Sequence, residues 1–398
     1  MSEPAPAPQP EMFDMKHGAG VLLLLTGTGF VGILGCILGA AMHGTRAQFA
    51  FSWLFAFMYF FTLCAGSLFW ILVHHATDAA WSVVVRRVLE NLAGLLPAVF
   101  LCLIPVLLCA HFLFHWWDLA PGADPLLDEK RAYLNHTFFL IRTLLYFFIL
   151  SGVALSLKNL STRQDAHGST WNSIRMRKVA VAGVPLFAMS LTFASFDWLM
   201  GLDYHWFSTM WGVYIFAGAA GSSMSMLVLI VTGLRAKGYL SYVTMEHYHI
   251  MGKLMLAFCV FWAYIGFSQY MLIWYADMPE EISYFIRRNI ASWNTMSIFL
   301  VVGRFFIPFP LLLLQGIKKV PKYLCMVAAW IVFMQAVDIY IIVMPMLHRK
   351  GFRPHILDLC ALAAIGSVLG ILFLKALSKN SLYPLRDPRL AESLALTN

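Results

Sequence analysis

The chain has 398 residues, of which 60% are hydrophobic and only 12% are charged. Soluble proteins carry about 25% charged residues, so this composition excludes an ordinary cytosolic enzyme, and an aromatic content of 15% excludes a disordered chain. The net charge of +8 would suggest nucleic acid as the partner of a soluble protein, but in a membrane protein it indicates cytoplasmic loops rich in Lys and Arg.

Ten apolar runs follow one another along the chain, each long enough for a transmembrane helix, which needs about 20 apolar residues. They cover residues 18–42, 50–74, 92–114, 133–157, 179–200, 207–234, 250–275, 289–315, 323–346 and 356–374. The pattern predicts an all-α integral membrane domain of ten transmembrane helices over residues 18–374. Tails of residues 1–17 and 375–398 flank this domain.

Lys and Arg are distributed unequally between the two ends of the predicted helices. The side of both tails carries 17 of them, including Arg86 and Arg87 before the third run and five in the loop 158–178, whereas the opposite side carries 8. Because Lys and Arg are enriched in cytoplasmic loops, we expect both termini in the cytoplasm.

Charged residues inside the apolar runs are few, and each is a functional candidate because an unpaired charge in hydrocarbon costs several kcal/mol. A structural interpretation is an Arg–Asp pair that locks two helices together. Asp338 lies deepest, and a carboxyl group there could exchange protons, whereas Asp358 could simply reach water from the outer end of its span. The charged residues within the runs are Arg142, Asp197, Lys253, Arg304, Asp338 and Asp358.

A weak internal repeat relates the second to fifth runs to the sixth to ninth. Arg142 and Arg304 each lie in the third run of a set, and Asp197 and Asp338 each lie in the fourth. Four helices separate the members of each pair, so both run in the same direction through the membrane. The repeat predicts two parallel four-helix bundles with two flanking helices.

Two histidine groups occur near the ends of predicted spans. His111 and His115 could anchor the third span at the membrane surface or hold a metal, but neither group has a full ligand set nearby. His247 and His249, beside Glu246 and one turn before Lys253, titrate near neutral pH and lie where a cytoplasmic proton would enter. The seven cysteines form no C-x-x-C motif, so we expect no metal site, haem or iron–sulfur cluster in this chain.

Two segments of the chain resemble sequence motifs of a known protein family. They are SFDWLMGLDYHWFSTMWG at 195–212 and FSQYMLIWYADMPEE at 267–281, and the segment 81–90 with its Arg86–Arg87 pair agrees with them. They are similar to signature segments of the large membrane subunits of alternative complex III, a bacterial quinol:electron-acceptor oxidoreductase. These subunits are in turn similar to the NrfD and polysulfide-reductase membrane anchors. The chain's length and short tail resemble the shorter of two paralogues in that complex.

This resemblance implies a ten-helix subunit of the bacterial inner membrane that binds no cofactor itself. The implied partners are the longer paralogue ActC, a periplasmic iron–sulfur and molybdopterin-like subunit, c-haem subunits, other small membrane subunits and the lipid bilayer, with no nucleic acid. Menaquinol or ubiquinol would be oxidised in ActC, and the haem c and iron–sulfur clusters would lie in the partner subunits. Whether this chain is itself an enzyme stays open, and its quinone-binding residues are unknown.

The expected role of this chain is scaffolding, together with proton translocation driven by quinol oxidation in the sister subunit. Alternatives are that the chain itself binds and oxidises quinol, or that it is a secondary transporter whose two bundles rock against each other. The proposed route has Asp197, Asp203 and His205 at the outer exit, Asp338 with Arg304 in the middle, and Glu246, His247 and His249 at the inner mouth.

Overall fold

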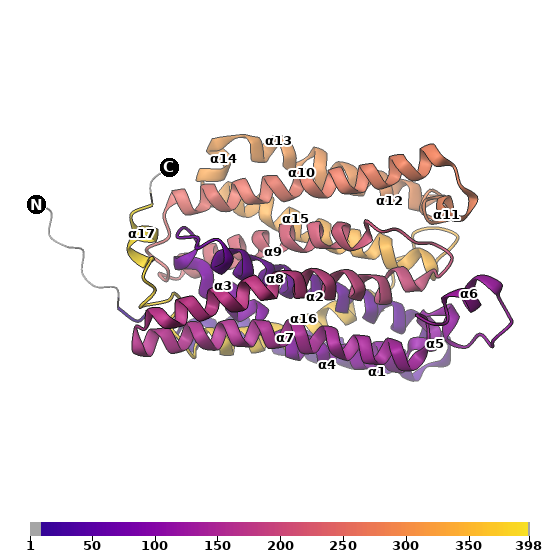
Figure 1. Ribbon diagram of the computed structural model, residues 1–398, viewed down its shortest axis with the longest axis horizontal. Helices are drawn as coiled ribbons and strands as arrows, with labels where there is room; N and C mark the ends of the chain where they lie inside the picture. Colours follow the sequence, from indigo (N-terminus) through magenta and orange to yellow (C-terminus); the bar gives the residue numbers. More distant parts are fainter. Residues whose placement is uncertain (1–8, 397–398) are drawn as a thin grey trace, which may run out of the picture.

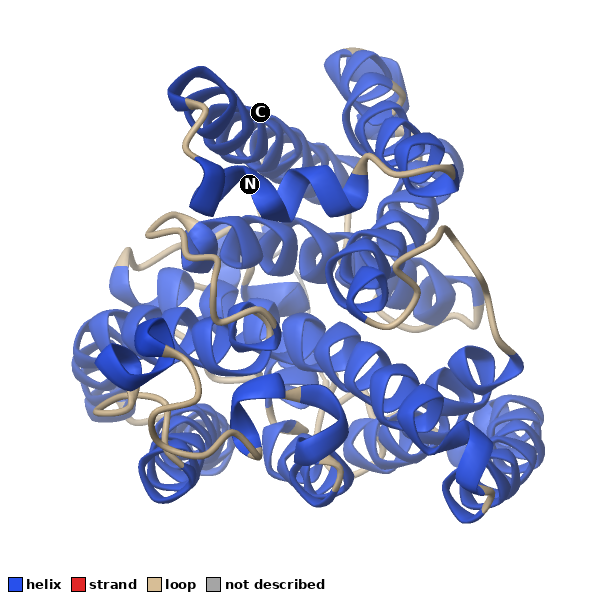
Figure 2. Cartoon of the chain, turned by 90° about the vertical axis from the view of Figure 1, so that its right-hand side faces the viewer, coloured by secondary structure: helices blue, strands red, loops and turns tan. Residues whose placement is uncertain are grey.

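The computed structural model describes residues 9–396, so parts of both predicted tails, residues 1–8 and 397–398, lie outside the described residues. Within the described chain the secondary structure is helical, without strands, and ten helices are long and apolar enough to cross a membrane (Figures 1 and 2). The prediction of an all-α membrane protein with ten spans is confirmed. Both termini lie at one end of the molecule, and the short helices α6 (Pro125–Lys130) and α11 (Pro279–Arg288) lie at the other (Figure 1).

The first bundle is built from the second to fifth spans. α2 packs against the third span and against α8, and α7 packs along α8. The third span is divided into two consecutive helices, with the short α5 (Ala110–Leu113) after them. The bundle helices are α2 (Arg46–Ala76), α3 (Val83–Ala93), α4 (Leu96–Leu108), α7 (His136–His167) and α8 (Thr170–Trp198).

The second bundle is built from the sixth to ninth spans. α9 packs against both α10 and α15, and the eighth span packs between α10 and α15. That span is broken into α12, a π-helical segment at Val302–Phe306 and α13, before the short α14 (Gln315–Lys319). The bundle helices are α9 (Trp211–Ala236), α10 (Met245–Ala276), α12 (Ser292–Val301), α13 (Pro308–Leu313) and α15 (Pro321–Val343).

The flanking helices α1 (Ala19–Ala41) and α16 (Ile356–Leu377) pack along each other, and α16 also packs on α2. This arrangement confirms the prediction of two four-helix bundles with two flanking helices. The short α17 (Leu390–Leu394) follows in the carboxyl-terminal tail and rests on α3.

The two bundles meet where the first helix of each, α2 and α9, pack together at the centre of the molecule. At Gly66 of α2, a Cβ atom would lie only 2.1 Å from the carbonyl oxygen of Ala219 on α9, so only glycine allows this close approach. The indole of Trp70 donates to the carbonyl of Ala220 over 2.9 Å and fixes the same interface. The seam between the bundles is therefore tightly packed.

Two predicted boundaries are wrong for clear reasons. The third span begins at Val83 rather than at residue 92, so Arg86 and Arg87 lie in a helix and not in a loop. Their burial is made tolerable by ion pairs, which a hydropathy pattern cannot detect. The predicted loop 158–178 is instead the ends of α7 and α8, which are separated only by Gly168, with φ of 66°, and the N-cap Ser169.

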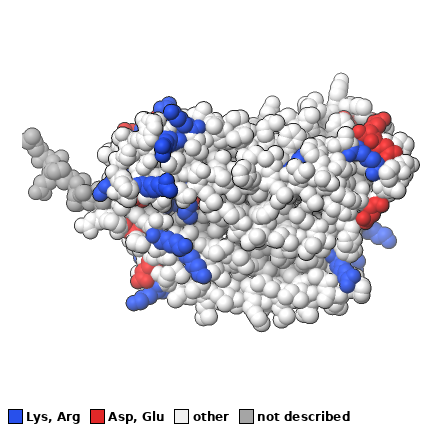
Figure 3. Space-filling model, turned by 60° about the horizontal axis from the view of Figure 1, so that its bottom comes forward, with Lys and Arg blue, Asp and Glu red and all other residues white. Residues whose placement is uncertain are grey.

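Charge on the surface separates into two ends with a broad uncharged belt between them (Figure 3). Lys and Arg gather mainly at the end that carries the termini, and Asp and Glu at the opposite end are mixed with further Lys and Arg. The belt between them is the surface that hydrocarbon would cover.

Candidate functional site: two buried arginine–aspartate pairs

A buried charge pair lies inside the second bundle, between its third and fourth helices. Arg304 comes from the π-helical segment and Asp338 from α15, and both side chains are buried. One guanidinium nitrogen, Nη1, lies 3.2 Å from Oδ2 of Asp338. The eighth and ninth spans, in which the sequence places Arg304 and Asp338, therefore bring the two side chains together.

Three further side chains complete the surroundings of this pair. The Tyr214 hydroxyl donates to Oδ1 of Asp338 over 2.6 Å, and the Trp262 indole donates to Oδ2 over 3.1 Å. Arg304 also donates to the side-chain oxygen of Gln335 and, over 3.2 Å, to the carbonyl of Met334. The guanidinium group therefore has acceptors other than the carboxylate, and the carboxylate has donors other than the guanidinium group.

The π-helical segment explains how Arg304 reaches the bundle interior. A π-bulge inserts one residue into a helix and is frequent at functional sites, because it rotates the side chains that follow it. The Trp330 indole donates to the carbonyl of Gly303 over 2.6 Å and so satisfies a carbonyl in the irregular segment. Gly218 on α9 leaves room for the cluster, since a Cβ atom there would lie 3.0 Å from Nη2 of Arg304.

The first bundle contains the equivalent pair, Arg142 on α7 and Asp197 on α8, both buried. Here the contact is bidentate: Nε donates to Oδ2 over 2.9 Å, and Nη2 donates to Oδ1 over 2.7 Å. The Tyr146 hydroxyl donates to Oδ2 over 2.8 Å, and the ring of Tyr133 lies 3.7 Å from the guanidinium carbon. Bidentate Arg–carboxylate contacts are the stronger and geometrically more specific kind.

Aromatic side chains fill the space between the Asp338 cluster and the outer loops. Tyr284 on α11 stacks on Trp206 at 4.1 Å and lies edge-on to Trp211 at 5.6 Å. The indole nitrogens of Trp206 and Trp211 are buried without a hydrogen-bond partner in the described chain, and buried indole N–H groups normally find an acceptor. Two hydrogen-bond donors without an acceptor therefore lie in the aromatic zone between Asp338 and the outer surface.

Asp203 and His205, predicted at the outer exit, lie together at the end opposite the termini. His205 Nδ1 lies 3.7 Å from Asp203, and His205 Nε2 lies 3.2 Å from Asp124. Asp203 also pairs with Arg287. Asp197, which was grouped with them, is instead the partner of Arg142.

Asp124 is held ionised by its neighbours in this outer group. The Tyr204 hydroxyl donates to Asp124 over 2.6 Å, and this hydrogen bond lowers the pKa of Asp124. Burial and the same contact raise the pKa of Tyr204 to about 12. Burial lowers the pKa of nearby Lys130, whose ammonium group donates to the Tyr204 carbonyl over 2.7 Å.

The predicted inner mouth is a separate cluster at the start of α10. Glu246 pairs with Lys319 at 2.7 Å and lies 3.6 Å from His249, while His247 caps the helix through Thr244. Lys253 is exposed one turn further on. Partial burial and the charge of Lys253 lower the pKa of Lys318.

The inner mouth lies far from the Arg304–Asp338 pair. Glu246 and Trp262, the α10 residue that contacts Asp338, are about 24 Å apart along the helix at 1.5 Å per residue. Ser222, Ser223 and Ser225 on α9 donate to carbonyls of their own helix. The hydroxyl groups of these three serines therefore do not link the inner mouth to the pair.

Asp358 has a local role that sequence did not predict. It is buried and accepts from Ser52 over 2.5 Å, from Tyr340 over 3.1 Å and from the His355 backbone over 2.9 Å. It belongs to a capping box at the start of α16. It therefore ties α16 to α2 and α15 instead of reaching water.

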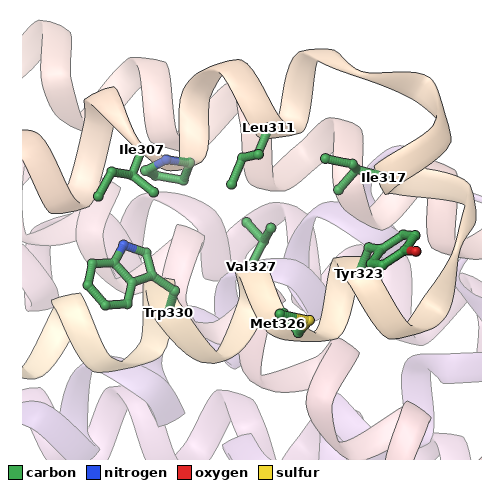
Figure 4. A pocket seen from close by; sticks show the side chains of 8 residues that line it. Ile307, Leu311, Ile317, Tyr323, Met326, Val327 and Trp330 are labelled. Atoms are coloured by element: carbon green, nitrogen blue, oxygen red, sulfur yellow. The ribbon is translucent and has the colours of Figure 1, made fainter.

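An apolar groove of about 430 Å³ lies on the outside of the second bundle, between α13, α14 and α15 (Figure 4). Ile307, Leu311, Tyr323, Met326 and Trp330 are among its lining residues. It offers no charged side chain, so it is part of the surface that faces hydrocarbon.

Sequence analysis missed a buried charge cluster at the terminus end of the first bundle. Arg86 and Arg87 are almost fully buried; Arg86 lies 2.9 Å from Glu90, and Arg87 lies 2.6 Å from Asp165. The spacing of Arg86 and Glu90, four residues apart, was a usable sign of a helical ion pair. No sequence spacing indicated the ion pairs with residues far along the chain, Arg86 with Asp387 and Arg87 with Asp165.

The described residues contain no group of three or more His, Cys, Asp or Glu side chains arranged to hold a metal ion. No protein-family model matches the chain, and no curated protein matches it.

Proposed function

We propose that this chain is a membrane subunit of an alternative complex III, of the type of ActF, the shorter paralogue, also called quinone-binding subunit 2. In this proposal it supports the quinol-oxidising subunit ActC and moves protons in response to quinol oxidation there. The motifs at 195–212 and 267–281 support the family, and the two-bundle architecture agrees with it.

The observation that carries the proton-moving role is the difference between the two buried pairs. Arg142 holds Asp197 with two short hydrogen bonds, whereas Arg304 touches Asp338 through one contact of 3.2 Å. Arg304 would keep Gln335 and the Met334 carbonyl as acceptors if Asp338 became neutral. If Asp197 became neutral, Nε and Nη2 of Arg142 would lose their acceptor, and only Nη1 would keep one, the Tyr133 carbonyl at 2.9 Å. A change of protonation is therefore less disruptive at Asp338 than at Asp197.

The chemistry follows from these partners. Oxidation of a quinol in a neighbouring subunit changes the local charge, which shifts the proton affinity of a nearby buried carboxyl group. Asp338 would take a proton from the inner side while Arg304 rests on Gln335. It would release that proton past Tyr214 and the aromatic zone toward Asp203 and His205.

The tight central seam counts against the transporter alternative. Rocking halves need an interface that opens, whereas α2 and α9 approach so closely at Gly66 and Ala219 that no side chain fits at position 66. The eighth span is broken by a π-helical segment, but its counterpart α7 is continuous. Matched breaks in the two halves, which transporter repeats commonly have, do not occur in these two spans.

The test replaces each aspartate by asparagine in the intact complex. Asp338→Asn should leave complex yield near that of the unmodified protein and abolish quinol-driven proton release in proteoliposomes while electron transfer continues. Asp197→Asn is the matched control: breaking a buried bidentate pair costs about 3–5 kcal/mol, so assembly should fail.

Two results would count against the relay. Normal yield with unchanged proton release in Asp338→Asn would show that no proton passes through Asp338. A loss of assembly as severe as that of Asp197→Asn would show that Asp338 is a structural clamp.

A further inference from the structure

A polar pocket of about 250 Å³ lies at the terminus end of the first bundle, away from both Arg–Asp pairs. The end of α2, the start of α8 and the carboxyl-terminal tail form its walls. Its polar lining residues include His74, His75, Arg86, Ser173 and Arg389.

The floor of the pocket is a fixed hydrogen-bonded network. Arg86 Nη1 lies 2.6 Å from Nε2 of His74, and His74 Nδ1 lies 2.5 Å from the Ser82 hydroxyl. An arginine can only donate, so His74 Nε2 is the acceptor and its Nδ1–H donates to Ser82. The network therefore holds His74 neutral and fixes its orientation.

The carboxylates in the lining are already paired. Arg86 Nη1 lies 2.7 Å from Asp387, and Arg177 lies 2.7 Å from Asp78. Arg389, in contrast, has no ion pair within the described chain. Among the cations that line the pocket, Arg389 is therefore the one without a carboxylate partner in the described chain.

His75 supplies a second, independent sign of a ligand. It is 6% exposed, lines the pocket, and its Nε2 atom has no hydrogen-bond partner among the described residues. A buried ring nitrogen without a partner is costly unless something binds it. The first turn of the 29-residue helix α8, with Thr170 and Ser173 in the lining, adds the positive end of a helix dipole.

The pocket lies at the depth of lipid headgroups. Trp171 on α8 is exposed, with Arg175 and Lys178 within 6 Å of its ring, and Trp beside cationic side chains is typical of a membrane interface. Leu72 and Leu68, one and two turns deeper on α2 than His75, are fully buried, so the side chains below the pocket on this helix face are apolar.

We infer that this pocket binds a phosphate group, from a phospholipid headgroup or from free phosphate. Arg389 would supply the charge, His75 a hydrogen bond and the start of α8 the dipole. Because Asp387 and Arg389 belong to the carboxyl-terminal tail, the bound phosphate would also tie that tail to α2 and α8.

The test uses the intact complex, stripped of lipid in a phosphate-free maltoside detergent. Phosphatidylglycerol and inorganic phosphate are added in separate arms, and bound phosphorus is measured against concentration. Arg389→Gln and His75→Phe should each weaken binding about tenfold, the effect of losing one charge-assisted hydrogen bond. The control is Arg175→Gln, which removes a cation of α8 that lies outside the pocket. It should leave binding unchanged.

If only phosphatidylglycerol binds saturably, the site binds a lipid headgroup. If both probes bind saturably, the site binds phosphate groups whether they are free or part of a lipid. The inference is overturned if neither probe saturates the unmodified complex. It is also overturned if both pocket variants, shown to be folded by an unchanged melting temperature, bind as well as Arg175→Gln does.

Discussion

At the residue scale, rare charges within apolar runs were the most informative feature of the sequence. Arg142, Asp197, Arg304 and Asp338 stand out because each is expensive in hydrocarbon. Their matched order placed one Arg and one Asp on successive helices of each bundle, and Arg304 was grouped with Asp338, but Asp197 was grouped with Asp203 and His205 instead of Arg142. Whether a pair is bidentate could not be predicted, because it depends on helix rotation. The roles of Tyr214 and Gln335 as partners were hidden for the same reason: nothing distinguishes them from ordinary polar residues on a helix.

The outer group allows a prediction of pH dependence. The Tyr204 hydrogen bond lowers the pKa of Asp124 in the folded protein. A carboxyl group with a lowered folded pKa stabilises the fold above its ordinary pKa, and this stabilisation is lost as the pH falls through the folded value. The melting temperature of Tyr204→Phe should therefore lie below that of the unmodified protein above about pH 5, and the difference should shrink toward about pH 3. A difference that stays constant over this range would show that the hydrogen bond does not control Asp124.

At the element scale, helix number and order were predictable from hydropathy, but irregular helices were not. α3 begins nine residues before its predicted start, because buried ion pairs let Arg86, Arg87 and Glu90 enter the helix. The π-helical segment around Arg304 packs against Trp330 and Met334, and no local sequence pattern reveals these contacts. Apolar length therefore defines a span, whereas its charged ends depend on distant partners.

The close approach of α2 and α9 makes a second prediction at this scale. Gly66→Ala places a methyl group against the Ala219 backbone, which cannot move aside without shifting α9. Overpacking of this kind costs about 1–3 kcal/mol, so the melting temperature should fall by several degrees. Gly233→Ala on α9, where no atom lies within 4 Å of the added group, is the matched control and should not lower it. Equal melting temperatures for both variants would refute the tight seam.

At the scale of the whole molecule, the two bundles, the central seam and the two charged ends form one arrangement. Sequence predicted the bundles because a parallel repeat places equivalent charges on equivalent helices. It could not predict that α2 and α9 form the seam, since which helices are neighbours depends on small residues such as Gly66. The polar pocket at the terminus end was equally hidden, because its walls come from α2, α8 and the carboxyl-terminal tail.

The orientation in the membrane is testable at this scale. The positive-inside bias predicts that the end with the termini is cytoplasmic. In intact cells, a membrane-impermeant maleimide should therefore label Ala123→Cys, at the opposite end, and not Lys379→Cys. Both positions are exposed, so accessibility does not bias the comparison. Labelling at residue 379 without labelling at residue 123 would reverse the proposed topology.

The most direct test of the central claim is purification of the tagged chain from its native membrane in a mild detergent. As a subunit of an alternative complex III, it should come out with a sister membrane subunit, and the preparation should show the absorption of c-type haem and contain iron–sulfur iron. A preparation that holds this chain alone or as a homo-oligomer, without haem absorption or iron, would contradict the account and favour a transporter.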